Sequence, residues 1–283
     1  MAKRAQPPPD ATPAAGATHP VVAWVERTTL MHLPAQPCAY LPGQSARERA
    51  FLAQRLDGAG YHALMDRGFR RSGSVFYRPD CAGCRRCVPL RVPVATFTPT
   101  RSQRRVARKN ADIVLTVRRP QCTPATFELY QRYLAYQHPE PARERSYEAF
   151  EEGYYSEVVD SLEVLYTLEG RVVAVSLLDV CAQSVSAVYH FFDPGCAARS
   201  LGVYSVLAEI EWARQAGVPH YYLGYWVEGS ATMAYKAQYG PHELLLDGRW
   251  VPGAPPGREP GPASVPAPPA RPAGGSAPGA PLG

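Results

Sequence analysis

Apolar and polar residues alternate with two different periods along the chain, and each period predicts a type of element. A period of two is typical of strands, whereas apolar residues three and four positions apart are typical of helices. Strands are therefore expected at 69–78, with a break at Gly73, and at 88–94, 112–118, 162–168, 171–180, 184–192, 220–225 and 243–246. Helices are expected at 45–55, 61–67, 101–110 and 201–216, and from Thr123 and from Ser146 onward. Pro89 and Pro93 predict an edge position for the strand 88–94, because proline cannot donate a hydrogen bond to a neighbouring strand.

The order of the elements after residue 160 predicts the fold. Three strands in succession, with Glu169-Gly170 as the tight turn between the first two, are followed by a helix and a further strand. This is the order of a GNAT-type N-acetyltransferase core, in which backbone N–H groups at the start of the helix bind pyrophosphate. Here the helix start reads Arg199-Ser-Leu-Gly202-Val-Tyr204, with tyrosine in the place of a small residue. We therefore expect the fold but not acetyl-CoA as its ligand, although an ordinary helix start explains the same residues equally well.

Composition divides the chain into a folded middle and two tails. Residues 1–20 and 252–283 consist mostly of Pro, Ala and Gly, which bury too little apolar surface to offset the entropy of ordering them. We expect both tails to be disordered. The rest should form an α+β protein, with a smaller cysteine-bearing domain at 21–120 and the acetyltransferase-like domain at 121–251. The sequence has no long apolar run and no secretion signal, so we expect a cytoplasmic protein without a membrane partner.

Positive charge is concentrated in one segment. Residues 67–119 contain 14 Arg or Lys against only Asp80 and Asp112, which suggests a polyanionic partner. Within this segment four arginines recur at helical spacing on one face of the expected helix: Arg101, Arg104, Arg105 and Arg108. Like charges so placed repel each other, and the phosphate backbone of a nucleic acid would relieve that repulsion. A solvated basic face is the alternative, and the sequence leaves it open.

The cysteines include one close group. Three of them have C-x-x-C-x-x-C spacing, which lets three thiolates meet at one ion or cluster. The candidate ligands are Cys81, Cys84 and Cys87, with Cys38 as a fourth. The spacing indicates a structural zinc or an iron–sulfur cluster. A reduced, metal-free turn whose neighbouring arginines contact phosphate explains it equally well.

Signatures of hydrolases and nucleotide-dependent enzymes are absent from the sequence, which has no nucleophile elbow, P-loop or Ser/His/Asp order. An acyl transfer from an already activated ester needs none of them and no cofactor, because a neutral amine attacks the ester directly. Such an enzyme aligns the two reactants, stabilises the oxyanion and accepts one proton.

Several short motifs together resemble the N-end-rule aminoacyl-tRNA protein transferases, most closely the bacterial leucyl branch that acts on N-terminal Asp or Glu. The motifs are Cys38-Ala-Tyr40-Leu-Pro-Gly43, Gly68-Phe-Arg-Arg71-Ser-Gly73, Tyr77-Arg-Pro79, Cys81 to Cys87, Arg101-Ser-Gln-Arg-Arg105, Phe191-Phe-Asp193-Pro194, Ser200-Leu-Gly202-Val-Tyr204, Tyr222-Leu-Gly224-Tyr225 and Met233-Ala-Tyr235-Lys236. The resemblance implies transfer of leucine from Leu-tRNA and degradation of the product through a downstream adaptor and protease. Eukaryotic arginyl relatives carry C-x-x-C where this chain has Cys38-Ala-Tyr-Leu41, so one expected metal ligand is missing. Arginyl transfer on the same scaffold and a non-catalytic, metal-dependent RNA-binding module are the alternatives.

The same motifs supply candidate site residues. The candidates for catalysis, which lie in or beside the C-terminal motifs, are Tyr189, Asp193, Tyr225 and Lys236. The four arginines of the basic helix, with Gly202 and Tyr204, are candidates for tRNA binding. An acceptor site that selects N-terminal Asp or Glu has to hold a carboxylate, and the planar fork of arginine suits that carboxylate best. Arg70 and Arg71 are the candidates, although contact with tRNA phosphate explains them equally well.

Overall fold

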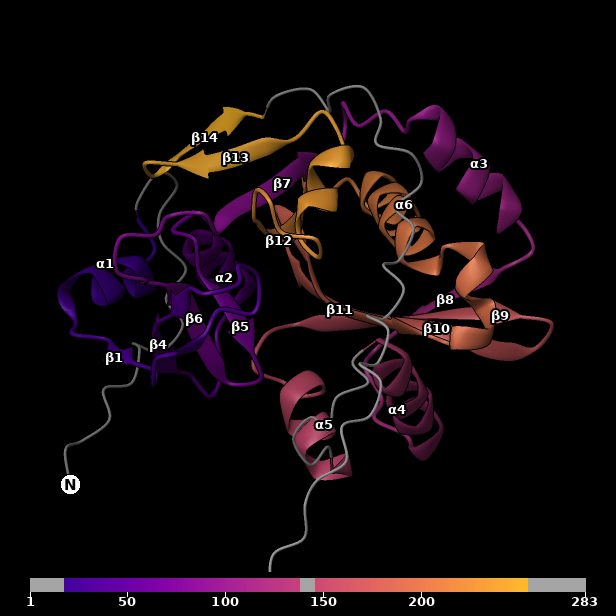
Figure 1. Ribbon diagram of the computed structural model, residues 1–283, viewed down its shortest axis with the longest axis horizontal. Coiled ribbons are helices and arrows are strands. Elements are labelled where there is room, and N and C mark those ends of the chain that lie inside the picture. The colour runs from indigo at the N-terminus through magenta and orange to yellow at the C-terminus, as the bar shows by residue number, and fades with distance from the viewer. Residues whose placement is uncertain (1–17, 138–145, 254–283) are drawn as a thin grey trace, which may run out of the picture.

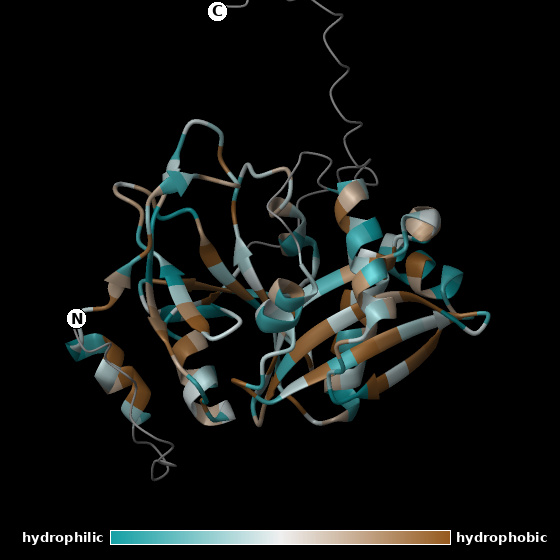
Figure 2. Ribbon diagram, turned by 90° about the horizontal axis from the view of Figure 1, so that it is seen from below, coloured by the Kyte–Doolittle hydropathy of each residue, from teal (hydrophilic) through white to brown (hydrophobic). Residues whose placement is uncertain are grey.

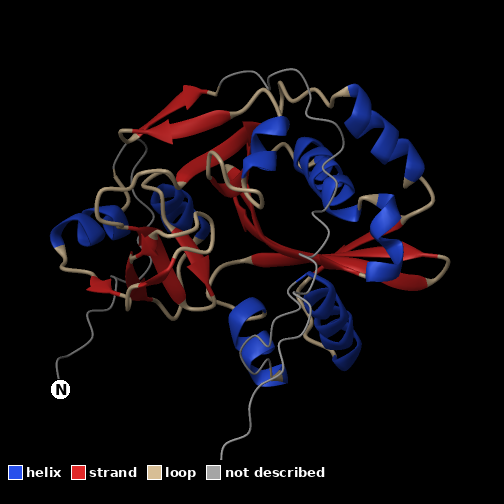
Figure 3. Cartoon of the chain, in the orientation of Figure 1, coloured by secondary structure: helices blue, strands red, loops and turns tan. Residues whose placement is uncertain are grey.

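The computed structural model describes residues 18–137 and 146–253 of the 283-residue chain. Its α-helices are α1 (Pro20–Arg27), α2 (Gly58–Met65), α3 (Arg101–Lys109), α4 (Pro124–Gln137), α5 (Tyr147–Tyr154) and α6 (Leu201–Gln215), and its 3-10 helices are η1 (Pro194–Arg199) and η2 (Ala234–Gln238). The strands are β1 (Met31–His32), β2 (Gln36–Pro37), β3 (Ser45–Ala46), β4 (Glu48–Leu52), β5 (Arg70–Ser72), β6 (Val75–Pro79), β7 (Val88–Pro93), β8 (Val114–Arg118), β9 (Ser161–Leu168), β10 (Arg171–Cys181), β11 (Ser184–Phe192), β12 (His220–Trp226), β13 (Glu243–Leu246) and β14 (Arg249–Pro252). Figure 1 labels most of these elements, and Figure 3 colours them by type.

An eight-stranded sheet forms the larger part of the molecule, in the order β14-β13-β7-β12-β11-β10-β9-β8. Its neighbouring strands are antiparallel except β11 and β12, which run parallel. Helix α6 packs against β11 and β12 on one face, whereas α4 and α5 lie on the opposite face (Figures 1 and 3). The meander β9-β10-β11, the helix α6 and the parallel strand β12 confirm the expected α+β fold with a GNAT-type core.

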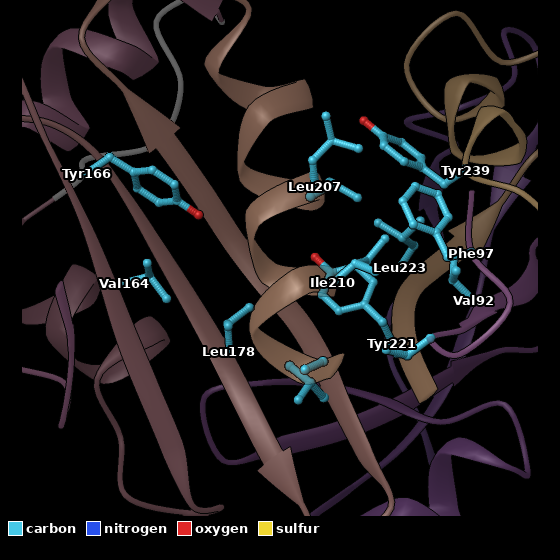
Figure 4. Close-up of a cluster of buried hydrophobic side chains, with 14 of the residues drawn as sticks. Val92, Phe97, Val164, Tyr166, Leu178, Leu207, Ile210, Tyr221, Leu223 and Tyr239 are labelled. Carbon is cyan, nitrogen blue, oxygen red and sulfur yellow. The ribbon is translucent and has the colours of Figure 1, made fainter. Parts of the chain in front are cut away.

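Each face of the large sheet has its own apolar core. On the α6 side, Tyr166 of β9 and Tyr221 of β12 reach toward the helix from two sides and pack with Ile210 (Figure 4). On the other side, Phe150 of α5 packs against Phe191 of β11, with ring centroids 6.0 Å apart. Strand β10 is buried on both faces, and the central strands accordingly carry long apolar stretches (brown in Figure 2).

A four-stranded sheet, β1-β4-β6-β5, forms the smaller part together with α1 and α2. Phe51 of β4 and Phe76 of β6 stack with ring centroids 5.3 Å apart, and Tyr61 of α2 meets Phe76 edge-on. The same core includes Cys181 and Tyr222 of the large sheet. Strands β7 and β8, which precede residue 120, pair with β12 and β9, which follow it. Side chains of the large sheet thus complete the core of the small one, and strands from both sides of the expected domain boundary pair within the large sheet. The boundary itself stays a prediction.

The N-terminal tail was expected to reach residue 20, and this is wrong for its last residues. His19 is buried, and its Nδ1 accepts a hydrogen bond from the backbone N–H of Val21 (3.2 Å), which caps α1. Residues 1–17 of the expected tail lie outside the described residues. Helix α1 was not expected, because Pro and Ala dominate the sequence directly before it.

The C-terminal tail was expected to begin at residue 252, and this is wrong for its first residue. Strand β14, which was not expected, continues to Pro252 and pairs with β13. Most of the expected C-terminal tail, 254–283, lies outside the described residues. Among the helices that the structure does describe, none is long and apolar enough to cross a membrane.

Two local expectations are wrong because tertiary pairing overrides a local signal. The capping-box pattern at 45–55 predicted a helix, but this segment forms β3 and β4, and β4 pairs along its length with β6. The prolines of β7 predicted an edge strand, but β7 lies between β12 and β13. Its pairing with β13 involves Leu90 and Arg91, so Pro89 and Pro93 fall outside it. Proline is therefore tolerated in an interior strand whose second neighbour is short.

Candidate functional site

The parallel strands β11 and β12 part from each other, and the opening between them is the candidate site. Their register covers Ser184–Ser186 of β11 and His220–Tyr222 of β12, although both strands continue for several residues. Both strands also have a register shift near this point, β11 against β10 and β12 against β7. Such irregularities bend a strand. Past the paired residues, backbone N–H and C=O groups on the facing edges of the two strands can bind a ligand.

Arg70 of β5 lies at the base of this opening. Its Nη1 donates a hydrogen bond to Ser186 Oγ (2.7 Å), and its Nη2 donates to the carbonyl oxygen of Ala187. Gly224 of β12 has a φ of +81°, and a Cβ at this position would lie 3.4 Å from Arg70 Cζ. The small sheet thus places a half-buried guanidinium at the point where the two strands of the large sheet separate. The predicted binding of an acceptor carboxylate by Arg70 stays a prediction.

Tyr225 and Lys236 lie beside Arg70. The hydroxyl of Tyr225 donates to the carbonyl oxygen of Gly68 (2.7 Å), and Lys236 Nζ donates to the carbonyl oxygen of Tyr225 (2.9 Å). Burial, with a further contribution from the positive charge of Arg70, lowers the pKa of Lys236 to about 7. An amine with a pKa near neutrality is suited to accept a proton at the pH of the cell. The contacts bring two of the four predicted catalytic residues together.

Arg71, although adjacent in sequence, has a different environment. Its Nε donates to Asp179 Oδ2 (2.7 Å) and its Nη2 to Asp179 Oδ1 (2.5 Å), and both side chains are essentially inaccessible to solvent. The remaining nitrogen, Nη1, donates to the carbonyl oxygen of Gly73 (3.2 Å). The fork is therefore occupied by a carboxylate of the protein itself. This corrects the expectation that Arg71 binds the acceptor. Successive residues of a strand point to opposite faces, which is why Arg70 and Arg71 have different surroundings.

Helix α3 carries the basic stripe that the sequence predicted. Thr100 and Gln103 form a capping box, and Gln103 Nε2 donates to the carbonyl oxygen of Gln238 (3.1 Å), which orients the helix on η2. The four arginines of the stripe, Arg101, Arg104, Arg105 and Arg108, are all exposed. None of these four forms an ion pair with any residue in the described ranges. Their charges are therefore open to an external anion.

The C-terminal end of α3 is fastened to the start of α6. Lys109 Nζ donates to the carbonyl oxygen of Ala198 (2.5 Å), and Arg199 holds Asp112 with two hydrogen bonds of 2.8 and 2.9 Å. A pocket of about 540 Å³ lies between the two helices, lined by Arg105, Val106, Arg108, Lys109, Ala198 and Ser200. Ser200 offers no side-chain hydrogen bond to the first turn of α6. Basic side chains and the N-cap residue of α6 thus line one pocket, and the positive end of a helix next to basic side chains suits a phosphate.

Gly202 and Tyr204 lie in the first turn of α6, as predicted. Among the described residues, a Cβ at Gly202 would meet no atom within 4 Å outside its own helix backbone and chain neighbours, so packing there does not require a glycine. Tyr204 packs edge-on against Tyr166 of β9, with ring centroids 6.0 Å apart. Their predicted contact with tRNA stays a prediction, since Tyr204 already has a packing role.

Comparisons with known proteins show which family the chain belongs to. The model for the N terminus of arginine-tRNA-protein transferase matches residues 36–105, and the model for its C terminus matches 125–246. The chain is 40% identical over 229 residues to the aspartate/glutamate leucyltransferase of Halorhodospira halophila, covering 79% of this chain and 96% of that protein. It is 39% identical over 234 residues to the protein of the same name from Thiobacillus denitrificans, covering 82% and 98%. The chain belongs to the arginine-tRNA-protein transferase family.

The other two predicted catalytic residues of this transferase have packing or capping contacts of their own. Tyr189 of β11 packs in the aromatic cluster under α4 and α5, 4.7 Å from Tyr154 between ring centroids. Asp193 follows β11, and its Oδ1 accepts a hydrogen bond from the backbone N–H of Gly195 (2.9 Å) while its Oδ2 is paired with Arg171. Asp193 is thus explained as the cap of η1. Its predicted catalytic role has no support in these contacts.

The cysteines of this transferase come together, but not as a closed ligand set. Burial raises the pKa of Cys87 to about 12, and the nearby thiols of Cys81, Cys38 and Cys84 add to the effect. Cys81 Sγ accepts a hydrogen bond from the backbone N–H of Arg47 (3.4 Å). Within the described ranges no group of three or more His, Cys, Asp or Glu side chains is arranged to hold a metal ion. The metal or cluster stays a prediction, and elemental analysis of anaerobically purified protein would test it.

A buried polar network beneath the opening was missed from the sequence. Glu209 of α6 accepts hydrogen bonds from the hydroxyls of Tyr166 (2.9 Å) and Tyr221. Ser176 Oγ donates to Tyr166 OH (3.3 Å) and is also bonded to His190 Nδ1 (2.9 Å). Burial raises the pKa of Glu209 and lowers that of His190 to about 3. The available signal was a glutamate within the apolar face of the helix 201–216, where a polar residue needs partners.

Proposed function

We propose that this transferase moves leucine from its tRNA to the N-terminal α-amine of proteins that begin with Asp or Glu. The observation that carries the proposal is the similarity, over nearly the whole length of the relatives, to proteins named aspartate/glutamate leucyltransferase. The family is named for arginine, so arginyl transfer is the second candidate. Relatives that are 39–41% identical favour leucine over it.

The opening between β11 and β12 supports an acyl transfer. The donor is an ester, and the acceptor amine attacks its carbonyl carbon, so that a C–N bond forms and the C–O bond to the tRNA breaks. The amine gives up a proton, for which neutral Lys236 is the acceptor, and the released hydroxyl of the tRNA takes one up. Backbone N–H groups on the facing strand edges are suited to the oxyanion. The pKa of Lys236, about 7, matches this task near neutral pH.

The basic pocket supports tRNA binding next to this opening. Helix α6 begins shortly after β11 ends, so its N-terminus lies at the end of the sheet where β11 and β12 have parted. A phosphate in the pocket between α3 and α6 would therefore place the aminoacyl end of a tRNA close to the opening. The exposed stripe of α3 would contact further phosphates, whose counterions are then released.

An acceptor assay separates the candidate functions. The protein is incubated with a peptide that begins with Asp, with charged tRNA pools and with labelled amino acids, and a peptide that begins with Ala serves as the control. Incorporation of leucine into the Asp peptide alone is the expected result. Incorporation of arginine would establish the second candidate, and tight tRNA binding without transfer would establish a non-catalytic RNA-binding module. Recognition of the product by an adaptor and a protease is a consequence of the proposal in the cell.

A further inference from the structure

The small sheet has one apolar face and one polar face. In its register, Arg70 of β5 lies opposite Tyr77 of β6, and Tyr77 lies opposite Ala50 of β4. Directly paired residues point to the same face, and so do residues two apart on one strand. Glu48 therefore shares a face with Arg70 and Tyr77. The opposite face carries the phenylalanines that pack under α1 and α2.

The polar face is turned toward the opening between β11 and β12. Arg70 donates hydrogen bonds to β11. The hydroxyl of Tyr225 on β12 donates to the carbonyl oxygen of Gly68, two residues before β5. Burial raises the pKa of Tyr225, and the neighbouring groups that act on it include Tyr77, Arg70 and Glu48. The carboxylate of Glu48 thus belongs to the surroundings of Tyr225, together with the guanidinium of Arg70.

Glu48 differs from the other carboxylates near this place. It is half-buried, yet in the part of the chain that the structure describes it forms no ion pair and no side-chain hydrogen bond. Asp179, by contrast, is held by Arg71. A carboxylate removed from water is costly unless a cation meets it. A ligand that brings a cation would remove this cost.

An N-terminal Asp or Glu carries two opposite charges within one residue, the α-ammonium and the side-chain carboxylate. The polar face offers the two complementary charges, a carboxylate at Glu48 and a guanidinium at Arg70. We propose that Glu48 binds the α-ammonium of the acceptor protein while Arg70 receives the side-chain carboxylate. The inference rests on the proposed function and names the residue that selects for an N-terminus. An internal Asp or Glu has no α-ammonium, so it lacks half of the contacts.

Peptide binding in the absence of tRNA tests Glu48 directly. The full chain is titrated with an Asp-starting peptide and with the same peptide in which Asp is replaced by a succinyl group, which keeps the carboxylate and removes the amine. The titration is run at about pH 6.5, where the peptide amine is charged. We expect the wild type to bind the Asp peptide about 10-fold more tightly, as for a charge-assisted hydrogen bond. In Glu48→Gln the two peptides should bind equally, and Glu128→Gln, an exposed residue of α4, should behave as the wild type.

The outcomes separate this inference from the proposed function. Leucine transfer to the Asp peptide is measured on the same wild-type preparation, and its absence would overturn the proposed function. Transfer by the wild type with an undiminished preference for the amine in Glu48→Gln would overturn the assignment of Glu48 alone. Thermal unfolding shows whether the variant folds. Should it not fold, Glu48→Ala, which removes the carboxylate without placing an amide at this half-buried position, replaces it, and an undiminished preference there would overturn the assignment equally.

Discussion

Arginines occupy two contrasting settings in this molecule, although both derive from the same basic segment of the sequence. On α3 they are exposed and have no acidic partner in the described residues, whereas Arg71 of β5 and Arg91 of β7 are paired with carboxylates of the protein. Arg91 of β7, for example, donates from its Nε to Glu243 Oε2 (2.7 Å), and its guanidinium lies 4.2 Å from the ring centre of Trp250. Net charge along the sequence therefore overstates the surface that is offered to an anion. Only the arginines without an internal partner are open to phosphate.

The largest effect should come from the enclosed side of this contrast. Arg71→Ala leaves Asp179 buried without its partner, so we expect the free energy of unfolding to fall by about 3–5 kcal/mol. Denaturant unfolding followed by circular dichroism measures this loss. Arg105→Ala on α3, where no ion pair is broken, is the matched control and should change the same quantity by less than about 0.5 kcal/mol. Similar losses in both variants would remove the distinction between the two settings.

A buried lysine next to the opening, Lys236, should determine the pH dependence of transfer. The pKa of Lys236 is lowered to about 7, so Lys236 is protonated below that pH and cannot accept a proton. We expect kcat to rise as the pH increases through about 7, where Lys236 becomes neutral. Lys236→Met should lower kcat by about 100-fold and remove this rise, since general-base catalysis contributes at least that much. An unchanged pH profile of kcat in the variant would rule out Lys236 as the proton acceptor.

Arg70 tests whether a half-buried arginine with spare donors differs from its enclosed neighbour. Arg70→Ala should raise KM for an Asp-starting peptide by about 10-fold, because a charge-assisted contact with the carboxylate is lost. Arg70→Lys should recover little of this, since lysine lacks the planar fork. The dissociation constant for charged tRNA should stay as in the wild type. A loss confined to tRNA affinity would move Arg70 to the nucleic-acid surface.

The smallest effect is expected on the exposed side. Replacing Arg104 and Arg105 by Gln should leave the free energy of unfolding unchanged and flatten the salt dependence of tRNA binding. Each lost phosphate contact lowers the slope of log K against log salt by about 0.9 for a duplex or about 0.7 for a single strand. A salt titration of binding measures the slope. The same slope in the variant and the wild type would mean that these two side chains do not contact the tRNA.

Periodicity predicted those parts of the fold that depend on short-range order. The meander, α6 and β12 follow from apolar spacing, and the stripe of α3 follows from arginines three and four apart. The strand β4 did not follow, because Ser45 of β3 and Glu48 of β4 imitate a helix cap and only the pairing of β4 with β6 decides against it. Arg70 and Arg71 could not be told apart in the sequence either. Their difference arises from which face of β5 is packed, and that depends on residues more than one hundred positions away.

The core shared by the two sheets has a consequence for how the molecule unfolds. Side chains of β10 and β12 complete the core of the small sheet, and β7, from the N-terminal half of the chain, is an interior strand of the large one. Neither part can lose its structure without exposing apolar surface of the other. Cooperativity should therefore extend over the whole described chain, with a single unfolding transition seen by probes in either sheet. A fragment cut near residue 120 would lack partners for both pieces of the core, and each half would be prone to aggregation.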